Sequence, residues 1–159
     1  MGGAIAQQLG SEQPAWLAGL VLVATAAHMP VSEAILTQSL TDVPAMAAFV
    51  VKYSWSRDAP DWLTERARAA ILALEPQVIH DDFVACNAFA GGELVGRIAV
   101  PTLIIGGEKD RMTAVAHSEW LHEHIVGSQL VIFPAASHRL TLEQGGEVAA
   151  VVSTFLQNL

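Results

Sequence analysis

Basic residues are scarce in this chain of 159 residues. Eight lysines and arginines stand against sixteen aspartates and glutamates, and the formal net charge is −8. The basic residues are also scattered, whereas a nucleic-acid-binding face needs clustered lysine and arginine to meet the phosphates. The same acidic balance disfavours an anionic membrane surface. We therefore expect neither nucleic acid nor a membrane as a partner.

Cysteine is nearly absent as well, and the N-terminal region carries no basic residues. The single cysteine, Cys86, excludes an internal disulfide and fits a reducing compartment. The first basic residue is Lys52, so the sequence shows no basic region of a signal peptide. The longest apolar run, residues 17–27, is shorter than the stretch of about 20 residues that spans a bilayer. These features predict a cytoplasmic location.

Apolar residues, in contrast, are abundant, at 52% of the chain. Three apolar runs lack alternation, as strands buried on both faces of a parallel sheet do, and they lie at 17–27, 100–107 and 128–136. Helical patterns accompany them at 4–12, 114–125 and 146–159. This strand–helix alternation predicts an α/β fold, a right-handed, doubly wound parallel sheet of about three strands with flanking helices.

The middle of the chain, residues 29–96, carries no strand pattern. Prolines stand near the starts of three of its four helical patterns, which lie at 32–40, 44–53, 60–74 and 76–90. Trp55 and Trp62 lie in or beside the loop between the second and third of these helices. We expect a helical insertion between two strands, and a hinge at AGGELVGR (90–97) that returns the chain to the sheet.

Two loops carry residues suited to catalysis. IIGGEKDRMT (104–113) places Asp110 just after a strand, with Glu108 as an alternative acid, and FPAASHRLTLEQ (133–144) places His138 after the next strand. Because active sites of open α/β sheets lie beyond the carboxyl ends of the strands, an acid and a histidine reach the same edge. They suit the acid and base of a nucleophile–His–acid triad. The simpler alternatives are a helix N-cap for Asp110 and an ordinary loop role for His138.

Other polar side chains suggest no metal site. The helical histidines lack the i,i+4 spacing of a zinc pair, and these are His117, His122 and His124. His28 follows a strand and is a candidate for pocket lining. Phe83 and Cys86 lie on a helical stripe and are candidates for pocket lining or for the core of the insertion. No cofactor and no metal are implied.

On these residues the chain resembles the α/β-hydrolase family, specifically its capped serine esterases and lactonases. VPTLIIGGEKD looks like the strand and loop of the triad acid, which implies Asp110, and FPAASHRLTLEQ like the loop of the triad base, which implies His138. The resemblance divides the chain into a partial hydrolase core, residues 1–28 and 97–159, and a helical cap, residues 29–96. MGGAIAQQLG looks like the segment after the nucleophile in Gly-x-Ser-Met-Gly-Gly, which implies an oxyanion role for the Met1 nitrogen.

The resemblance implies a serine one residue before Met1, so the chain supplies the acid and base without the nucleophile. Four serines are poorly placed as substitutes, namely Ser11, Ser32, Ser39 and Ser137, and Cys86, on a cap helix that can face the pocket, is not favoured either. We therefore expect the C-terminal half of a hydrolase, inactive alone. The parent enzyme would act on a small, uncharged, hydrophobic ester-like substrate.

The sequence is also consistent with several alternatives. The chain is a truncated, non-catalytic ligand-binding or interaction protein, or the C-terminal subunit of a split hydrolase. The family also contains C–C bond hydrolases, dehalogenases and acyltransferases. If the 159-residue chain exists as such, the strand at residues 20–25 would have a free edge, at which we expect self-association or a missing N-terminal half.

Overall fold

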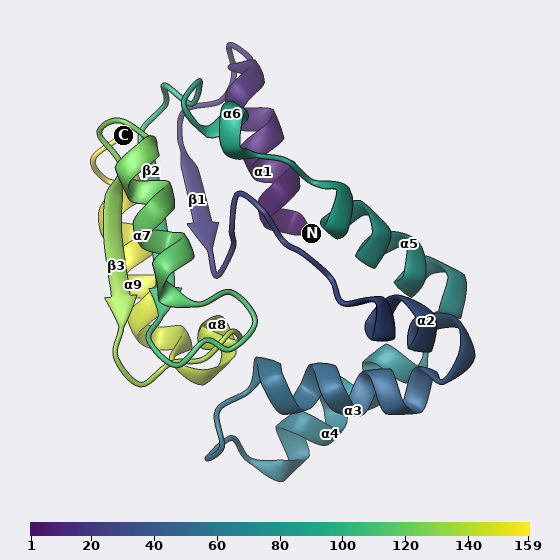
Figure 1. Cartoon of the computed structure of the whole chain (residues 1–159). Helices are drawn as coiled ribbons and strands as arrows, with labels where there is room; N and C mark the ends of the chain where they lie inside the picture. The colour runs from purple at the N-terminus through teal and green to yellow at the C-terminus, as the bar shows by residue number, and fades with distance from the viewer.

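A parallel sheet of three strands, in the order β1-β2-β3, forms the centre of the molecule. The computed structural model describes all 159 residues (Figure 1). The sheet confirms the predicted fold class, although its strands are shorter than the apolar runs: β1 Leu20–Val23, β2 Thr102–Gly107 and β3 Gln129–Phe133. The first strand ends early because Ala24 adopts a φ of 45°, outside the extended region.

Helices cover both faces of this sheet. Leu22 and Ile104 face a cluster completed by α1, α6 and α7, whereas Leu103 and Ile105 face a cluster completed by α8 and α9. Neighbouring residues of one strand thus point into two different apolar layers, which is why the runs lack alternation. The helices are α1 Gly2–Glu12, α6 Gly92–Val95, α7 Val115–His124, α8 Leu140–Glu143 and α9 Gly145–Leu156.

Residues 33–88 form four further helices, here called the four-helix segment. Figure 1 shows them extending to one side of the sheet, with the end of α3 reaching back toward α8. The segment has a small core of its own around Ile35, Met46 and Ile79. Ser32 and Asp42 cap the first two helices through hydrogen bonds to backbone N–H groups. The helices are α2 Glu33–Thr41, α3 Val43–Ser54, α4 Asp61–Leu72 and α5 Pro76–Ala88.

The two chain connections between the sheet and the four-helix segment run side by side. His28 and Ala90 form an isolated antiparallel bridge, and the Gly91 N–H donates to the Ala27 carbonyl at 2.7 Å. The stretch predicted as a hinge, residues 90–97, lies between α5 and β2 and contains the helical turn α6 Gly92–Val95, in which Val95 is fully buried. Burial of an apolar side chain fixes this stretch against the sheet.

The tryptophans flank the loop between α3 and α4, as the sequence predicts, but α8 is not predicted. Trp55 follows α3 directly and is 2% exposed, whereas Trp62 lies in the first turn of α4 and is 66% exposed. The short helix α8 falls within a stretch that carries no helical pattern in the sequence. It forms where Leu140 inserts into the cluster between the sheet and α9.

The amino end of α1 lies against the loop that follows β1. The fully buried Gln7 donates from Nε2 to the carbonyls of Gly3, at 3.0 Å, and Ala26, at 3.1 Å. A Cβ atom at Gly3 would lie 2.2 Å from Oγ1 of Thr25, so the close approach requires glycine. The start of α1 and the carboxyl end of β1 are therefore at the same edge of the sheet.

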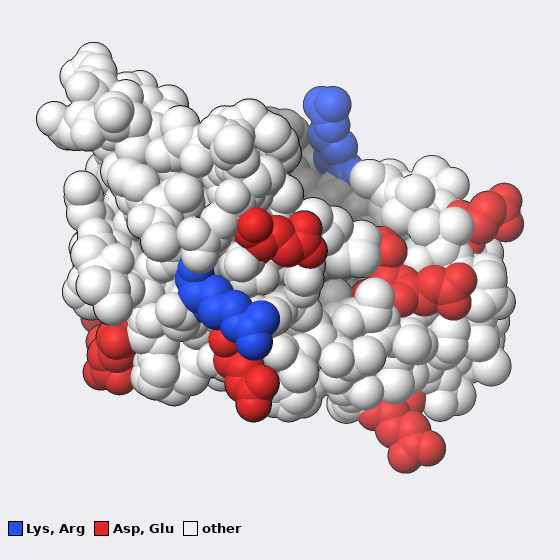
Figure 2. Space-filling model, turned by 90° about the horizontal axis from the view of Figure 1, so that it is seen from above, with Lys and Arg blue, Asp and Glu red and all other residues white.

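The surface carries few charges for its size. Acidic side chains outnumber basic ones on the face shown in Figure 2, and most of that face is uncharged. Large apolar side chains are also exposed, including Trp16 at 72% and Ile5 at 59%. No helix has both the length and the apolar character needed to cross a membrane.

Candidate functional site

Asp110 is held rigidly by its own loop. The loop leaves β2 at Gly107, whose carbonyl accepts from the Asp110 N–H at 3.1 Å. Oδ1 of Asp110 accepts from the N–H groups of Met112, at 2.7 Å, and Thr113, at 2.8 Å. These bonds satisfy the backbone of the turn before α7, whose N-cap is Ala114, so Asp110 itself is not the N-cap. The second carboxylate oxygen, Oδ2, accepts neither of these two backbone hydrogen bonds.

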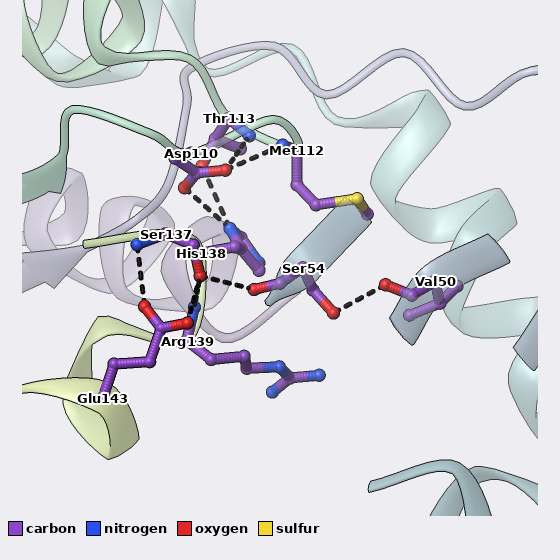
Figure 3. Close-up of polar contacts among 9 residues, drawn as sticks. All are labelled: Val50, Ser54, Asp110, Met112, Thr113, Ser137, His138, Arg139 and Glu143. Carbon is purple, nitrogen blue, oxygen red and sulfur yellow. Dashed lines mark hydrogen bonds and ion pairs between the residues drawn. The ribbon is translucent and has the colours of Figure 1, made fainter. Parts of the chain in front are cut away.

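That second oxygen, Oδ2, meets His138. The distance from Nδ1 of His138 to Oδ2 of Asp110 is 2.9 Å, and the Thr113 hydroxyl donates to the same oxygen at 2.9 Å (Figure 3). Because a carboxylate only accepts hydrogen bonds, the imidazole proton belongs on Nδ1. Nε2 then carries the lone pair, and it forms no hydrogen bond within the chain. The His138 side chain is 25% exposed, whereas that of Asp110 is fully buried.

Electrostatics keep Asp110 ionised. Burial by itself raises the pKa of this carboxyl, but the hydrogen bond from His138, the electrostatic attraction of its ring and the N–H groups of Thr113 and Met112 outweigh burial. The pKa of Asp110 therefore lies below its ordinary value of 3.8. A buried carboxylate bonded to Nδ1 leaves the imidazole with Nε2 as its basic atom, the arrangement of a general base.

The residue that follows Asp110 and the residue that follows His138 both bind the end of α3. Arg111, next to Asp110, donates to the carbonyls of Lys52 and Trp55, the latter at 3.0 Å. The N–H of Arg139, next to His138, donates to the carbonyl of Ser54 at 3.1 Å. The loops of the acid and of the base thus share one anchor, although α3 lies far away in the sequence.

The structure brings together only part of the predicted site. Asp110 and His138 meet, whereas the alternative acid Glu108 is exposed and its side chain forms no hydrogen bond. Phe83 packs against the core of the four-helix segment. Cys86 is half-buried on α5.

Two hollows border other predicted residues. The first, of about 400 Å³, is lined by His28 together with His117 and Trp120. The second, of about 430 Å³, runs between α1 and α5 and has Met1 and Phe89 in its wall. Neither hollow includes Asp110 or His138, and neither includes Phe83 or Cys86.

The helical histidines are engaged separately. Nδ1 of His122 lies 2.9 Å from the Ser128 hydroxyl, and the His124 ring stacks on Trp120 with 3.8 Å between centroids. No three side chains of the histidine, cysteine, aspartate and glutamate types come together as metal ligands would. Nothing in the geometry supplies a metal-binding set.

Three residues of the site are not among those predicted from the sequence. Thr113 stands three residues after Asp110, the spacing at which a threonine completes an Asp turn, and this was a usable local signal. Arg111 and Glu143 instead bind the end of α3 and the residues just after it. Glu143 accepts a hydrogen bond from the Ser56 N–H, 87 residues away in the sequence. No local sequence pattern predicts a contact over that separation.

Comparisons with known proteins agree on the kind of fold. A family model described as serine aminopeptidase, S33 matches residues 1–145. Human serine hydrolase BPHL is 30% identical over 120 residues, covering 66% of this chain and 40% of the human protein. The 3-oxoadipate enol-lactonase 1 of Acinetobacter baylyi is 26% identical over 170 residues, covering 100% of this chain and 62% of the lactonase.

Solved structures extend the likeness to three dimensions. The structure of a thermophilic esterase has a TM-score of 0.88 at 32% identity and covers 98% of this chain and 62% of the esterase. The enol-lactonase from Burkholderia xenovorans LB400 has a TM-score of 0.93 at 21% identity, with 99% and 63% covered, a likeness of fold. The chain spans less than two thirds of the length of each of these four proteins.

Proposed function

The chain belongs to the α/β-hydrolase family, of the serine esterase and lactonase type, and from that premise we propose that it takes part in hydrolysing a carboxylic ester or a related acyl bond. The hydrogen bond between Asp110 and His138, with Nε2 of His138 left free, is the observation that carries the proposal. A relative and a structural neighbour named as a lactonase and an esterase support the choice of bond.

In the proposed reaction His138 is the general base. Its Nε2 removes the proton of a serine hydroxyl as the oxygen attacks the acyl carbon, and then gives that proton to the leaving alcohol. Nε2 next takes a proton from water as the water oxygen attacks the acyl-enzyme, and it gives that proton to the serine oxygen as the acid is released. Asp110 holds the proton on Nδ1 and stabilises the imidazolium that forms at each step.

We propose that the serine lies outside these 159 residues, either before Met1 in a longer chain or on a separate polypeptide. The free Nε2 of His138 supports this proposal, as do relatives that exceed the chain in length. Met1 stands at the N-cap of α1, where backbone N–H groups and the helix dipole favour negative charge. In a longer chain its N–H would be one donor to the oxyanion.

The remaining surfaces of α1 and β1 suit such a segment. The side of β1 away from β2 has no strand partner, and the hollow beside α1 is lined mainly by apolar residues. Ile5 on this helix is 59% exposed. We propose that these surfaces receive the segment with the serine, or a second copy of the chain in its absence.

We also propose that the four-helix segment is a cap over the site, supported by the bonds from Arg111 and Arg139 to the end of α3. An uncharged, hydrophobic substrate is in keeping with a chain that is 52% hydrophobic. The single cysteine, Cys86, supports a reducing, cytoplasmic setting.

The test begins with the codons upstream of Met1 in the gene. If they read in frame through Gly-x-Ser, the extended chain should hydrolyse a nitrophenyl ester, and His138→Ala should abolish the turnover. The 159-residue chain should show none. Turnover by the extended chain that persists in His138→Ala would contradict the proposal. A stop codon just upstream would direct the search to a separate polypeptide that co-purifies and ends in Gly-x-Ser-x-Gly.

A further inference from the structure

Glu143 is the point at which the loop of His138 and the end of α3 are joined. It is the last residue of α8, and its carboxylate has no basic partner. Oε1 accepts from the Ser56 N–H at 2.7 Å, and Oε2 accepts from the Ser137 N–H at 2.8 Å. Figure 3 shows the carboxylate facing Ser137 on the side away from Asp110.

The Ser137 hydroxyl adds to this junction. Its oxygen lies 2.8 Å from Oε1 of Glu143 and 2.9 Å from the Ser54 carbonyl, and Ser137 is fully buried. On the other side of His138, the Arg139 N–H donates to that same carbonyl. The backbone is therefore hydrogen-bonded on both sides of the histidine, at Ser137 and at Arg139.

We propose that Glu143 is a positioning residue, which holds Nδ1 of His138 within hydrogen-bonding distance of Asp110 by linking Ser137 to the turn at Ser56. The catalytic purpose of this positioning rests on the proposed function, but the hydrogen bond between His138 and Asp110 can be measured without any turnover. Glu143 forms no hydrogen bond with the imidazole, so it acts on His138 only through its bonds to Ser137 and Ser56.

The charge state of Glu143 agrees with this role. Burial raises the pKa of its carboxyl, but the hydrogen bonds from Ser56 and Ser137 outweigh it, and the pKa lies below its ordinary value of 4.5. A carboxylate is also the only side-chain group of this shape that accepts at both positions. A glutamine would place an NH₂ group against one of the two N–H donors, whichever way it turned.

The experiment uses Glu143→Gln in the 159-residue chain and follows the Nδ1 proton of His138 by NMR. We expect this proton to exchange with water roughly tenfold faster than in the wild type, the factor expected from loss of one hydrogen bond of ordinary strength. The amide protons of Ser56 and Ser137 should exchange faster too. Glu147→Gln is the matched control, because Glu147 is exposed, its side chain forms no hydrogen bond and it carries the same charge.

A second variant guards against loss of the fold. Ser137→Ala removes the hydroxyl and keeps the N–H bond to Oε2, so we expect a smaller change in the same direction. An unchanged Nδ1 exchange rate in Glu143→Gln would overturn the inference. If that variant does not fold, an unchanged rate in Ser137→Ala would overturn it, and so would an equal effect of Glu147→Gln. Failure of the proposed function would be seen separately, as ester turnover by the extended chain that persists in His138→Ala.

Discussion

Replacing Asp110 by asparagine tests the acid–base pair directly. The amide oxygen keeps the two backbone bonds from Met112 and Thr113, so the NH₂ group faces Nδ1 of His138 and the Thr113 hydroxyl. The imidazole must then accept at Nδ1, which moves its proton to Nε2. Hydrogen bonds to a charged group contribute about 1.5–3 kcal/mol, and relief of carboxylate burial offsets part of the loss. We expect the free energy of unfolding to fall by about 2 kcal/mol at neutral pH.

Urea denaturation measures this change. With a slope of about 1.5 kcal/mol per molar urea, the midpoint should fall by about 1.3 M. Because the folded-state pKa of Asp110 is lowered, its stabilisation is complete above the ordinary pKa and is lost as the pH falls through the folded value. The gap between wild type and variant should therefore shrink below about pH 4. The ¹⁵N shifts of the His138 ring should show the proton on Nε2.

Asp58→Asn is the matched control, because Asp58 is exposed and its side chain forms no hydrogen bond. It should leave the urea midpoint unchanged. Equal midpoints for Asp110→Asn and wild type at neutral pH would refute the reasoning. A gap of the same size in acid would refute the part that depends on ionisation.

Three further predictions concern the surroundings of the pair. A Cβ at Gly107 would lie 2.5 Å from the backbone carbonyl oxygen of Ala136, in the loop after β3. Gly107→Ala should therefore lower the free energy of unfolding, measured by thermal denaturation, by about 2–3 kcal/mol. Gly96→Ala is the control, because a Cβ there meets no atom within 4 Å, and it should change that free energy by less than about 0.5 kcal/mol. Arg111→Gln should speed amide exchange at the end of α3 by roughly tenfold, an effect that the exposed Arg97→Gln should lack. Size-exclusion chromatography with light scattering should find the 159-residue chain self-associated through the unpaired side of β1, and a clean monomer would contradict this.

The parts of the site that the sequence predicts are those set by strand order. Asp110 and His138 each follow a strand, and β2 and β3 are neighbours, so the two loops meet at one edge. The apolar runs likewise predict the sheet, because burial on both faces removes polar alternation. Their ends are less well predicted, since a single backbone angle at Ala24 terminates β1.

The parts that the sequence does not predict depend on where the four-helix segment lies. Helical spacing put Phe83 and Cys86 on one stripe of α5, but only the packing of that helix decides what the stripe faces, and Phe83 faces the segment's own core. Glu143 contacts Ser56 through backbone N–H groups, which every residue type except proline offers. Such a contact does not restrict the residue type at the donor position, so the sequence does not reveal it.

The junction at Glu143 also bears on the order in which the molecule folds. Asp110 and His138 are 28 residues apart, within a single β2–α7–β3 unit, whereas the contact between Glu143 and Ser56 spans 87 residues. Closing the longer loop costs about 1 kcal/mol more chain entropy, and contacts of long sequence separation form later in folding. The histidine and its carboxylate would then meet early, in a loop that is still loose, and the chain would reach its final alignment only when α3 docks.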